Sequence, residues 1–254
     1  MIPIKSKNDL EMLRESGRIL SEILDELEKS VVPGITTAEI DRLAEDLILR
    51  RKVLPAFKGY RGYPAAACVS VNEEIVHGIP GKRTIKDGDN VSIDVGVNFR
   101  GFFSDAAITV IAGNPLPDMA RLVEVTRLAL LEGISRTVVD NRLGDVSHAI
   151  QRFVESNGFS VVRQFVGHGI GLQLHEEPEV PNFGIPGRGP LLKEGMVLAI
   201  EPMVNMGTWQ SEILENGWTA VTGDGLPSAH FEHTVAVTEK GPEILTGRGD
   251  VDNA

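Results

Sequence analysis

The chain has 254 residues, of which 42% are hydrophobic and 24% charged, and its mean hydropathy of -0.02 is that of a globular protein with a sizeable core. Its formal charge is -11, and because the basic residues form no cluster, a nucleic-acid partner is excluded. No apolar run approaches the about 20 residues of a membrane span, and the start has no signal-peptide pattern, so we expect a cytoplasmic protein with no membrane partner. Cys68 is the only cysteine, which excludes an internal disulfide and fits a reducing compartment.

Two amphipathic helices are predicted in the first part of the chain. Apolar residues recur at three- and four-residue spacing over 8–30, and Pro33-Gly34 ends that helix. Thr36 and Glu39 have the spacing of a capping box, which starts the second helix. From 55 to 80 the pattern changes to loops and strands. We interpret both helices as scaffold.

Residues 91–110 form two β-branched, aromatic-rich runs around a short turn, which predicts a β-hairpin. With the turn centred between Phe99 and Arg100, Asp94 lies directly opposite Asp105 on one face. Facing Cβ atoms are about 4.5–5.5 Å apart, and like charges at that distance are destabilising. We therefore expect a positive group between the two carboxylates. If the turn is offset, both acids are merely solvated.

The order of elements then repeats. Helices are predicted over 115–138 and around 146–153, the latter closed by Gly158. The apolar positions of the later helix lie 106 residues after those of the second helix. Residue by residue, 86–98 can be laid over 193–205 at a constant offset of 107. The alternative is a chance similarity between two alternating strands.

We expect this repeat to build two α+β halves, 1–112 and 113–245, related by an approximate two-fold axis. Together they form one catalytic domain over 1–254, with a flexible tail at 247–254. Each half supplies one acid from each of two strands to a shared centre.

Four acids and one histidine predict a metal centre. The repeat pairs Asp94 with Glu201 and Asp105 with Glu232, and His168 lies among glycines that let the backbone approach a ligand. The four carboxylates carry a charge that two divalent cations would neutralise. Mixed oxygen and imidazole ligands suit Mn, Fe, Co or Zn. A pair of such ions is an established hydrolytic arrangement that supplies hydroxide at neutral pH.

Seven motifs point to one family, and the resemblance covers nearly the whole chain. The motifs are Asn72–Pro80, Ile93–Gly96, Ser104–Ala107, Gly167–Gly171, Leu174–Pro178, Ala199–Pro202 and His230–Thr234. Together they closely resemble the type I methionine aminopeptidases in their short bacterial form. The resemblance implies the pita-bread α+β fold, with two pseudo-two-fold-related halves and a central antiparallel sheet flanked by helices. It also implies metal-dependent removal of the N-terminal methionine from nascent proteins and peptides, favouring a small second residue.

The resemblance further implies two divalent metal ions. Asp105 and Glu232 bridge both ions, Asp94 binds one, and His168 and Glu201 bind the other. The substrate's free α-amine binds one ion, and a hydroxide that bridges the two attacks the first peptide bond. The ligand set accepts several metals and leaves the physiological one open.

Catalytic roles also follow from the resemblance. His175 stabilises the developing oxyanion. Glu201 shuttles the proton, and His77 holds the scissile amide and assists the leaving nitrogen.

The pocket for the methionine side chain is implied by four further positions: Tyr60, Tyr63, Cys68 and Trp218. Aromatic contacts suit an apolar, polarisable thioether. Two more substrate-binding positions vary from the best-known pattern: Phe57 stands where some members have cysteine, and Leu174 where many have phenylalanine. The tolerance for first residues other than methionine is therefore left open.

Other residues receive simpler interpretations. His148 lies in an amphipathic helix as a solvated or packed residue. His233 points to the strand face opposite its neighbour Glu232 and is excluded as a ligand, whereas His230 could be a ligand or not. Arg248-Gly249-Asp250 spells a cell-adhesion tripeptide, which we interpret as a polar, frayed terminus.

Two other functions stay open at this stage. One is an X-Pro aminopeptidase or prolidase of the same fold, and the other is a non-enzymatic binding protein that kept the fold. The expected partners are nascent polypeptides with a free N-terminal methionine. We expect a monomer and leave a transient association with the ribosome open.

Overall fold

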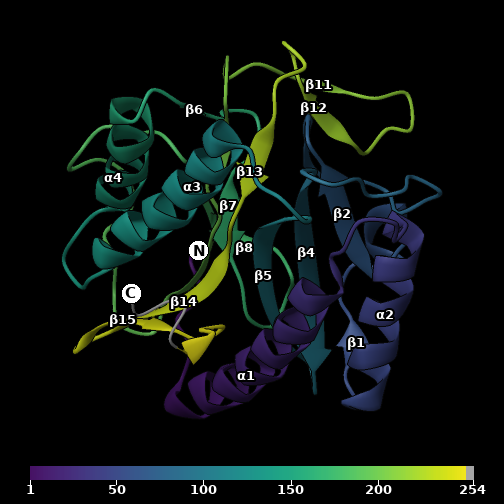
Figure 1. Ribbon diagram of the computed structural model, residues 1–254. Coiled ribbons are helices and arrows are strands. Elements are labelled where there is room, and N and C mark those ends of the chain that lie inside the picture. The colour runs from purple at the N-terminus through teal and green to yellow at the C-terminus, as the bar shows by residue number, and fades with distance from the viewer. Residues whose placement is uncertain (250–254) are drawn as a thin grey trace.

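Four helices lie on one side of the β-strands in the computed structural model, which describes residues 1–249 (Figure 1). Ser6 and Asp9 form a capping box before the first helix, and Thr36 and Glu39 form the predicted one before the second. Pro117 occupies the first turn of the third helix, where its missing N–H has no intrahelical partner to lose. The helices are α1 (Lys7–Ser30), α2 (Thr37–Arg50), α3 (Pro117–Ser135) and α4 (Leu143–Ser156), with the short 3-10 turn η1 (Tyr60–Gly62).

The strands of the described residues are β1 (Leu54–Pro55), β2 (Ala67–Val71), β3 (Glu74–Val76), β4 (Asn90–Phe99), β5 (Phe102–Ile111), β6 (Ser160–Val161), β7 (Gly167–Gly169), β8 (Glu176–Val180), β9 (Val197–Ile200), β10 (Met203–Asn205), β11 (Ser211–Ile213), β12 (Ala220–Thr222), β13 (Ser228–His230), β14 (His233–Thr238) and β15 (Gly241–Ile244). They pair in four antiparallel groups. In the first, β4 pairs with β1, β2 and β5; the others are ordered β13-β10-β6, β11-β12-β3 and β15-β14-β9-β7-β8. The α+β class is therefore confirmed.

The β4–β5 hairpin is present, but its register differs from the prediction. Its turn is Arg100-Gly101, and both residues have positive φ, 54° and 90°, as a two-residue type I′ turn requires. The Asn98 side chain accepts a hydrogen bond from the Gly101 N–H at 2.8 Å. Asp94 therefore faces Ala107, not Asp105. Because the shift is two residues, Asp105 keeps its predicted face and is a diagonal neighbour of Asp94.

The two halves of the chain meet where β5 runs beside the segment that leads into β14. Ala107 and Glu232 form an antiparallel bridge, with each backbone N–H donating to the other's carbonyl. The Thr234 hydroxyl donates to the backbone carbonyl of Asp105 at 2.8 Å and accepts from the backbone N–H of Asp105 at 3.0 Å. One acid of each half is thereby fixed at the same seam.

Strand alternation separates the core from the site. Val95 and Ala106 point toward the helices and pack with Leu24 of α1, and all three are fully buried. Asp94 and Asp105 point to the opposite face. A second apolar cluster packs α3 and α4 on the strands of the other half. Each buried leucine stabilises the fold by about 1.5–3 kcal/mol, which gives the acids a rigid support.

The end of the described chain is anchored on α1. The Arg248 guanidinium donates to Asp25 at 2.7 Å and also pairs with Glu28. Its side chain is only 5% exposed, so this part of the predicted flexible tail is held in place. Asp250 and the residues after it lie outside the described residues.

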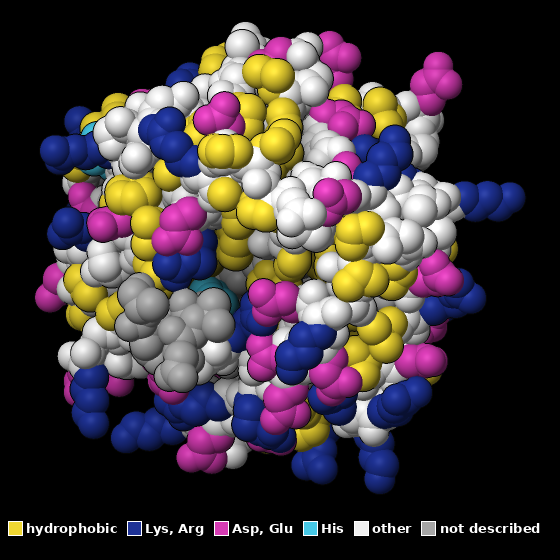
Figure 2. Space-filling view, in the orientation of Figure 1, with side chains coloured by type: hydrophobic (Ala, Val, Ile, Leu, Met, Phe, Trp, Pro, Cys, Tyr) yellow, Lys and Arg dark blue, Asp and Glu magenta, His cyan; other side chains and the backbone are white. Residues whose placement is uncertain are grey.

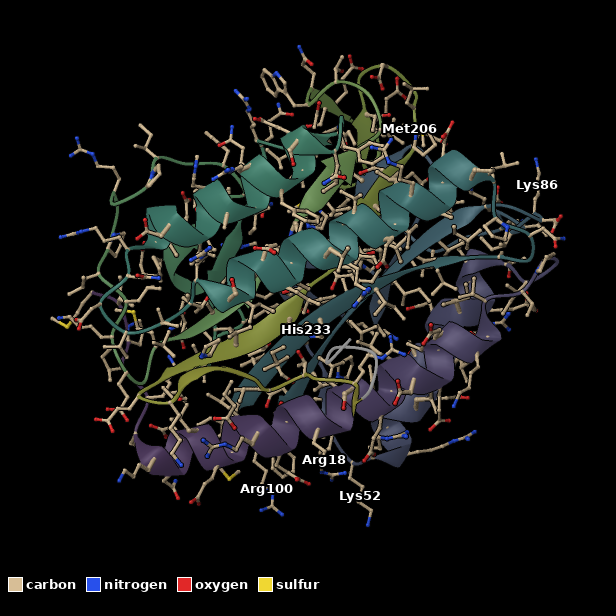
Figure 3. All side chains as sticks on the ribbon, turned by 60° about the vertical axis from the view of Figure 1, so that its left-hand side comes forward. Arg18, Lys52, Lys86, Arg100, Met206 and His233 are labelled. Carbon is tan, nitrogen blue, oxygen red and sulfur yellow. The ribbon has the colours of Figure 1, made fainter. Side chains whose placement is uncertain are left out.

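The surface carries charges of both signs. They are interspersed in Figure 2, most densely over α1 and α2 at the lower right. Arg18 on α1 and Arg100 in the hairpin turn both point outward (Figure 3). Among residues 1–249, no helix is both long enough and apolar enough to cross a membrane.

Candidate metal centre and pocket

A cavity of about 280 Å³ opens on the face of the strands that the helices leave uncovered. Its walls include every residue predicted above for the site: Phe57, Tyr60, Tyr63, Cys68, His77, Asp94, Asp105, His168, Leu174, His175, Glu201, Trp218 and Glu232. The five predicted metal ligands come from three strands and two connections of both halves, so the fold brings together residues up to 138 positions apart.

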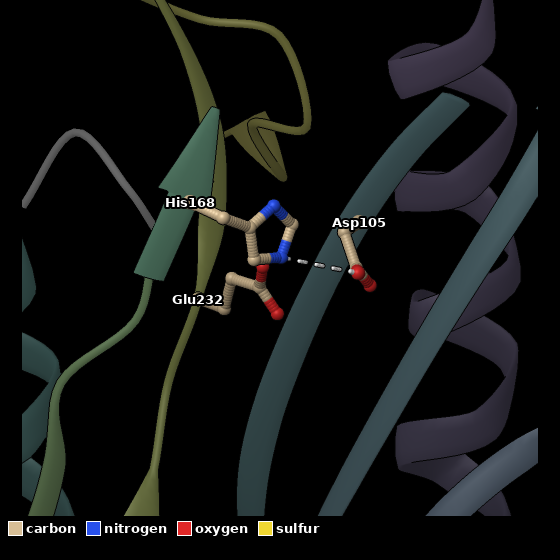
Figure 4. Close-up of side chains that lie close together, drawn as sticks. All are labelled: Asp105, His168 and Glu232. Atoms are coloured by element: carbon tan, nitrogen blue, oxygen red, sulfur yellow. Dashed lines mark ion pairs between the residues drawn. The ribbon is translucent and has the colours of Figure 1, made fainter. Parts of the chain in front are cut away.

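The five predicted ligands lie close together. Asp94 and Asp105 come from β4 and β5, His168 from β7, and Glu201 and Glu232 from the residues that follow β9 and β13. The Nε2 atom of His168 is 3.7 Å from a Glu201 oxygen and 4.0 Å from an Asp105 oxygen. Figure 4 shows the imidazole directed between the carboxylates of Asp105 and Glu232.

The carboxylates of this cluster require positive charge. Within residues 1–249, no hydrogen-bond donor reaches Oδ1 of Asp94, Oδ1 of Asp105 or Oε1 of Glu232, although all three atoms are buried. An unpaired buried charge is costly, and the usual solutions are a counter-charge, a metal ion or a bound proton. The residues therefore fit divalent cations, which supply the missing partners of all these oxygens at once.

Without a cation, burial and mutual repulsion keep protons on the acids. Burial raises the pKa of Asp105 to about 7. Burial, followed by repulsion from neighbouring carboxylates, also raises the pKa of Asp94, Glu201 and Glu232 well above the ordinary range. A cation reverses this effect, because it favours the ionised form of each ligand.

His168 is held as a neutral imidazole. Its Nδ1 lies 2.9 Å from the Gly169 carbonyl, and because a carbonyl only accepts, Nδ1 must donate. The lone pair is then on Nε2, which faces the acids. Burial lowers the pKa of His168 to about 4, so the ring is neutral at pH 7.

The glycines around His168 have a role other than the predicted approach to a ligand. A Cβ at Gly167 would lie 2.3 Å from the Ala199 carbonyl oxygen, and one at Gly169 would lie 2.2 Å from that of Glu177. Backbone, not ligand, occupies that space. The glycines let β7 fit between its neighbours and so fix the position of His168.

His175 is packed against the predicted ligand His168 and the pocket wall. Its ring centroid is 4.2 Å from that of His168 and stacks on Tyr60 at 5.1 Å. Its Nδ1 is 3.0 Å from the Tyr60 hydroxyl, which leaves Nε2 for a substrate. Burial lowers the pKa of His175 to about 3, and repulsion from His168, which is itself protonated at such acid pH, is the next cause. The neutral ring can then donate from Nε2 when the tyrosine hydroxyl donates to Nδ1.

The loop that carries His175 is tied to the N-terminal segment. Glu176 forms a buried ion pair with Lys5, and its other oxygen accepts from the N–H groups of Leu172 and Gln173 at 2.8 and 3.1 Å. Lys5 also donates its own N–H to the Gly195 carbonyl at 2.7 Å. Lys5 could not be predicted from the sequence, because its partner lies 171 residues away.

His77 has a backbone in the left-handed region, with φ of 60°, which is a strained conformation for a residue other than glycine. Its ring packs edge-on against Phe165 at 5.5 Å and Trp218 at 6.3 Å. Burial lowers its pKa, so it too is neutral at pH 7. Phe165 was missed from the sequence, although it lies just before the glycine-flanked histidine.

The apolar end of the pocket is rigid. The Tyr63 ring meets the Trp218 ring edge-on at 5.1 Å, and its hydroxyl donates to the Gly78 carbonyl at 3.0 Å. Phe57, Cys68 and Leu174 are buried in the same cluster. Arg61, Val76, Gln164 and Val166 also line the cavity and were not predicted.

The fold and this centre define a class of protein, the metal-dependent hydrolases built on paired carboxylates and histidine. The sequence profile of metallopeptidase family M24 matches residues 11–239, and the chain belongs to that family.

Individual relatives show which members of this family the chain resembles. A methionine aminopeptidase of Clostridium perfringens is 55% identical over 97% of this chain and 99% of its own, and methionine aminopeptidase 1 of Bacillus subtilis is 50% identical with the same coverage. The crystal structure of a Thermotoga maritima methionine aminopeptidase superimposes with a TM-score of 0.95 at 50% identity, covering 97% of this chain and 99% of that one. A Pyrococcus furiosus prolidase, at 22% identity and a TM-score of 0.79, shares the fold alone. The predicted pita-bread fold and family resemblance are confirmed.

Proposed function

We propose that this chain hydrolyses the first peptide bond of proteins and peptides that begin with a free methionine. The observation that carries the proposal is the cluster of buried, unpartnered carboxylate oxygens at the floor of an apolar pocket. A metal centre supplies the chemistry, and the pocket supplies the selectivity.

The five predicted ligands would hold two divalent ions. Asp105 and Glu232, near the seam between the halves, would be ligands of both ions, Asp94 of one, and His168 and Glu201 of the other. When bound, the ions lower the pKa of water toward neutrality and bind the amine of the substrate. Co, Mn, Fe and Zn all suit this donor set.

The residues of the chain orient the substrate and move protons. Neutral His175, held by Tyr60, donates a hydrogen bond to the oxyanion that develops on the scissile carbonyl. Glu201 carries the proton from the attacking water, and His77 holds the scissile amide so that the leaving nitrogen receives it. Burial keeps both histidines neutral, so neither repels the cations.

The pocket selects the first residue by shape and polarity. Tyr63, Trp218 and Leu174 form an apolar enclosure suited to an unbranched thioether. A charged side chain would lose its hydration there without a counter-charge. The residue after methionine is small, as the likeness to the methionine aminopeptidases implies. The natural substrates are nascent polypeptides, and the enzyme acts as a monomer in the cytoplasm, with a transient association with the ribosome as a further part of the proposal.

A competition assay tests the proposal. The metal-reconstituted protein receives Met-Ala-Ser, Leu-Ala-Ser and Ala-Pro-Ser in one mixture. We expect methionine to be released first. Because one methylene changes selectivity by only about 10–200-fold, norleucine-initiated peptides should stay measurable substrates, whereas Lys-initiated ones should not. N-formylated Met-Ala-Ser should resist cleavage, since its nitrogen has no free lone pair.

Preferential release of alanine from Ala-Pro-Ser would replace this function by an X-Pro aminopeptidase, and no release at all from the metal-loaded protein would favour a binding protein.

A further inference from the structure

A second histidine, His230, points into the metal centre and has no assigned partner. It is the last residue of β13 and only 1% exposed. Across residues 1–249, neither of its ring nitrogens has a hydrogen-bond partner. A neutral imidazole has one donor and one acceptor nitrogen, and burying either one unpaired is costly. Such a ring requires a partner that residues 1–249 do not provide.

His230 lies beside the carboxylate of Glu201. Its Nε2 is 3.5 Å from Oε2 of Glu201, whereas Nε2 of His168 is 3.7 Å from Oε1. Glu201 is thus flanked by two imidazoles, one near each oxygen. A distance of 3.5 Å exceeds the 2.7–3.2 Å range that is usual for an N–H···O hydrogen bond. The two side chains are therefore too far apart for a direct hydrogen bond, and their separation fits two ligands of one further group that lies between them.

That third group is a metal ion. One ligand atom each from Glu201, His230 and Glu232 lies within 4.8 Å of the other two. Two ligand atoms of one ion lie within a few ångströms of each other, as Nε2 of His230 and Oε2 of Glu201 do. Building on the proposed function, we propose that His230 coordinates, through Nε2, the ion held by Glu201. The centre then has two imidazoles and four carboxylates.

The backbone of His230 is fixed for this role. Its N–H donates to the Thr109 hydroxyl at 2.9 Å, and that hydroxyl donates to the His230 carbonyl at 2.6 Å. Met203 pairs with it on the other side, across β10 and β13. A ligand held on both sides loses little freedom when the ion binds.

A second imidazole changes which metals the centre prefers. Imidazole suits Co, Ni and Zn, whereas carboxylate, carbonyl and water oxygens suit Mn. His230 therefore raises the affinity for Co and Zn relative to Mn. Its removal should lower the Co and Zn affinities more than the Mn affinity.

His230→Gln tests this role, because a glutamine amide fills similar space but is a poor ligand for Co and Zn. The matched control is His233→Gln. His233 is also buried, but its Nδ1 lies 3.0 Å from the Thr246 hydroxyl and its ring lies on the side of β14 toward α3 (Figure 3). Metal-free wild type and both variants are titrated calorimetrically with CoCl₂, ZnCl₂ and MnCl₂. X-ray absorption spectra of the cobalt-loaded proteins count the imidazoles per chain.

In the wild type we expect two ions per chain and two imidazoles in the cobalt spectrum. In His230→Gln we expect one imidazole and an affinity for Co and Zn at one site that is at least about 10-fold lower, with a smaller change for Mn. His233→Gln should match the wild type. If His230→Gln does not fold, His230→Ala is studied instead, and added free imidazole should restore the wild-type cobalt spectrum.

Other outcomes overturn the proposal in distinguishable ways. One imidazole in the wild-type spectrum, or an unchanged count in His230→Gln, excludes His230 as a ligand. A weaker Co affinity with an unchanged imidazole count would instead make His230 a positioning residue for Glu201. A wild type that binds no divalent ion overturns this proposal and the proposed function together, whereas intact coordination without methionine release overturns only the function.

Discussion

At the scale of single residues, Glu232 is the acid whose loss the centre can least replace. It belongs to both candidate ligand groups and sits at the seam between the halves. Glu232→Gln should lower metal affinity by about 10–100-fold or more, because an amide cannot bridge two cations as a carboxylate does. Metal analysis of the dialysed protein measures this, with the exposed Glu239→Gln as the control. Full metal content and normal turnover in the Glu232 variant would remove Glu232 from the ligand set.

His175 separates chemistry from metal binding. It contacts the His168 ring but is not a predicted ligand. His175→Ala should keep the metal content of the wild type and reduce kcat by about 10²–10³-fold, as for the loss of one oxyanion donor. Tyr60→Phe should reduce kcat less, because the imidazole stays and only its hydrogen bond at Nδ1 is lost. Loss of metal from His175→Ala would show that His175 is itself a ligand.

At the scale of elements, the loop before β8 is held by a buried ion pair. Lys5 and Glu176 are 3% and 7% exposed, so removing one partner leaves an uncompensated charge. Lys5→Met should destabilise the fold by about 3–5 kcal/mol. It should also lower kcat by about 10²-fold through displacement of His175, with metal affinity unchanged. Urea unfolding and single-turnover kinetics measure the two effects.

The double variant Lys5→Met/Glu176→Gln is the control for the charge. It removes the unpaired carboxylate, so it should regain most of the stability and part of the turnover. Equal stability of Lys5→Met and wild type would show that the pair does not hold the loop.

The same elements show how far the sequence could predict the fold. Periodicity located α1, and periodicity with a capping box located α2, because those signals are local. The hairpin register was wrong by two positions, since only turn chemistry distinguishes a centre at Phe99-Arg100 from one at Arg100-Gly101. The error left Asp94 and Asp105 on one face, because side-chain direction repeats every two residues.

At the scale of the whole molecule, the prediction depended on the internal repeat and on the motifs. The offset of 107 paired acids that periodicity alone could not bring together, and the family resemblance assigned their roles. Contacts with no counterpart in the other half could not be predicted. One example is the ion pair of Lys5 with Glu176. The lack of hydrogen-bond partners at both ring nitrogens of His230 could not be predicted either. The division into halves at residue 112 stays a prediction.

Without metal, the stability of the whole molecule should depend on pH. In the metal-free fold, burial raises the pKa of Asp105 to about 7 and that of Glu232 well above the ordinary range. The unfolded chain has ionised both acids by about pH 5. Between pH 6.5 and 8 the folded state therefore binds more protons than the unfolded state, and its stability falls as pH rises. The buried histidines do not offset this fall, because their lowered pKa values leave them neutral in the fold, and the unfolded chain has also lost most of its histidine protons above pH 6.5.

Each proton retained by the folded cluster changes the free energy of unfolding by about 1.4 kcal/mol per pH unit, and 1 kcal/mol corresponds to about 2–4 °C in Tm. With a chelator present, Tm should therefore fall by several degrees from pH 6.5 to 8. With saturating MnCl₂ the slope should largely vanish, because the ions hold the carboxylates ionised in the fold. Calorimetric scans at matched ionic strength measure both series. A chelated protein whose Tm is constant or rises over this range would show that its buried acids are already ionised and balanced by a charge other than a metal ion.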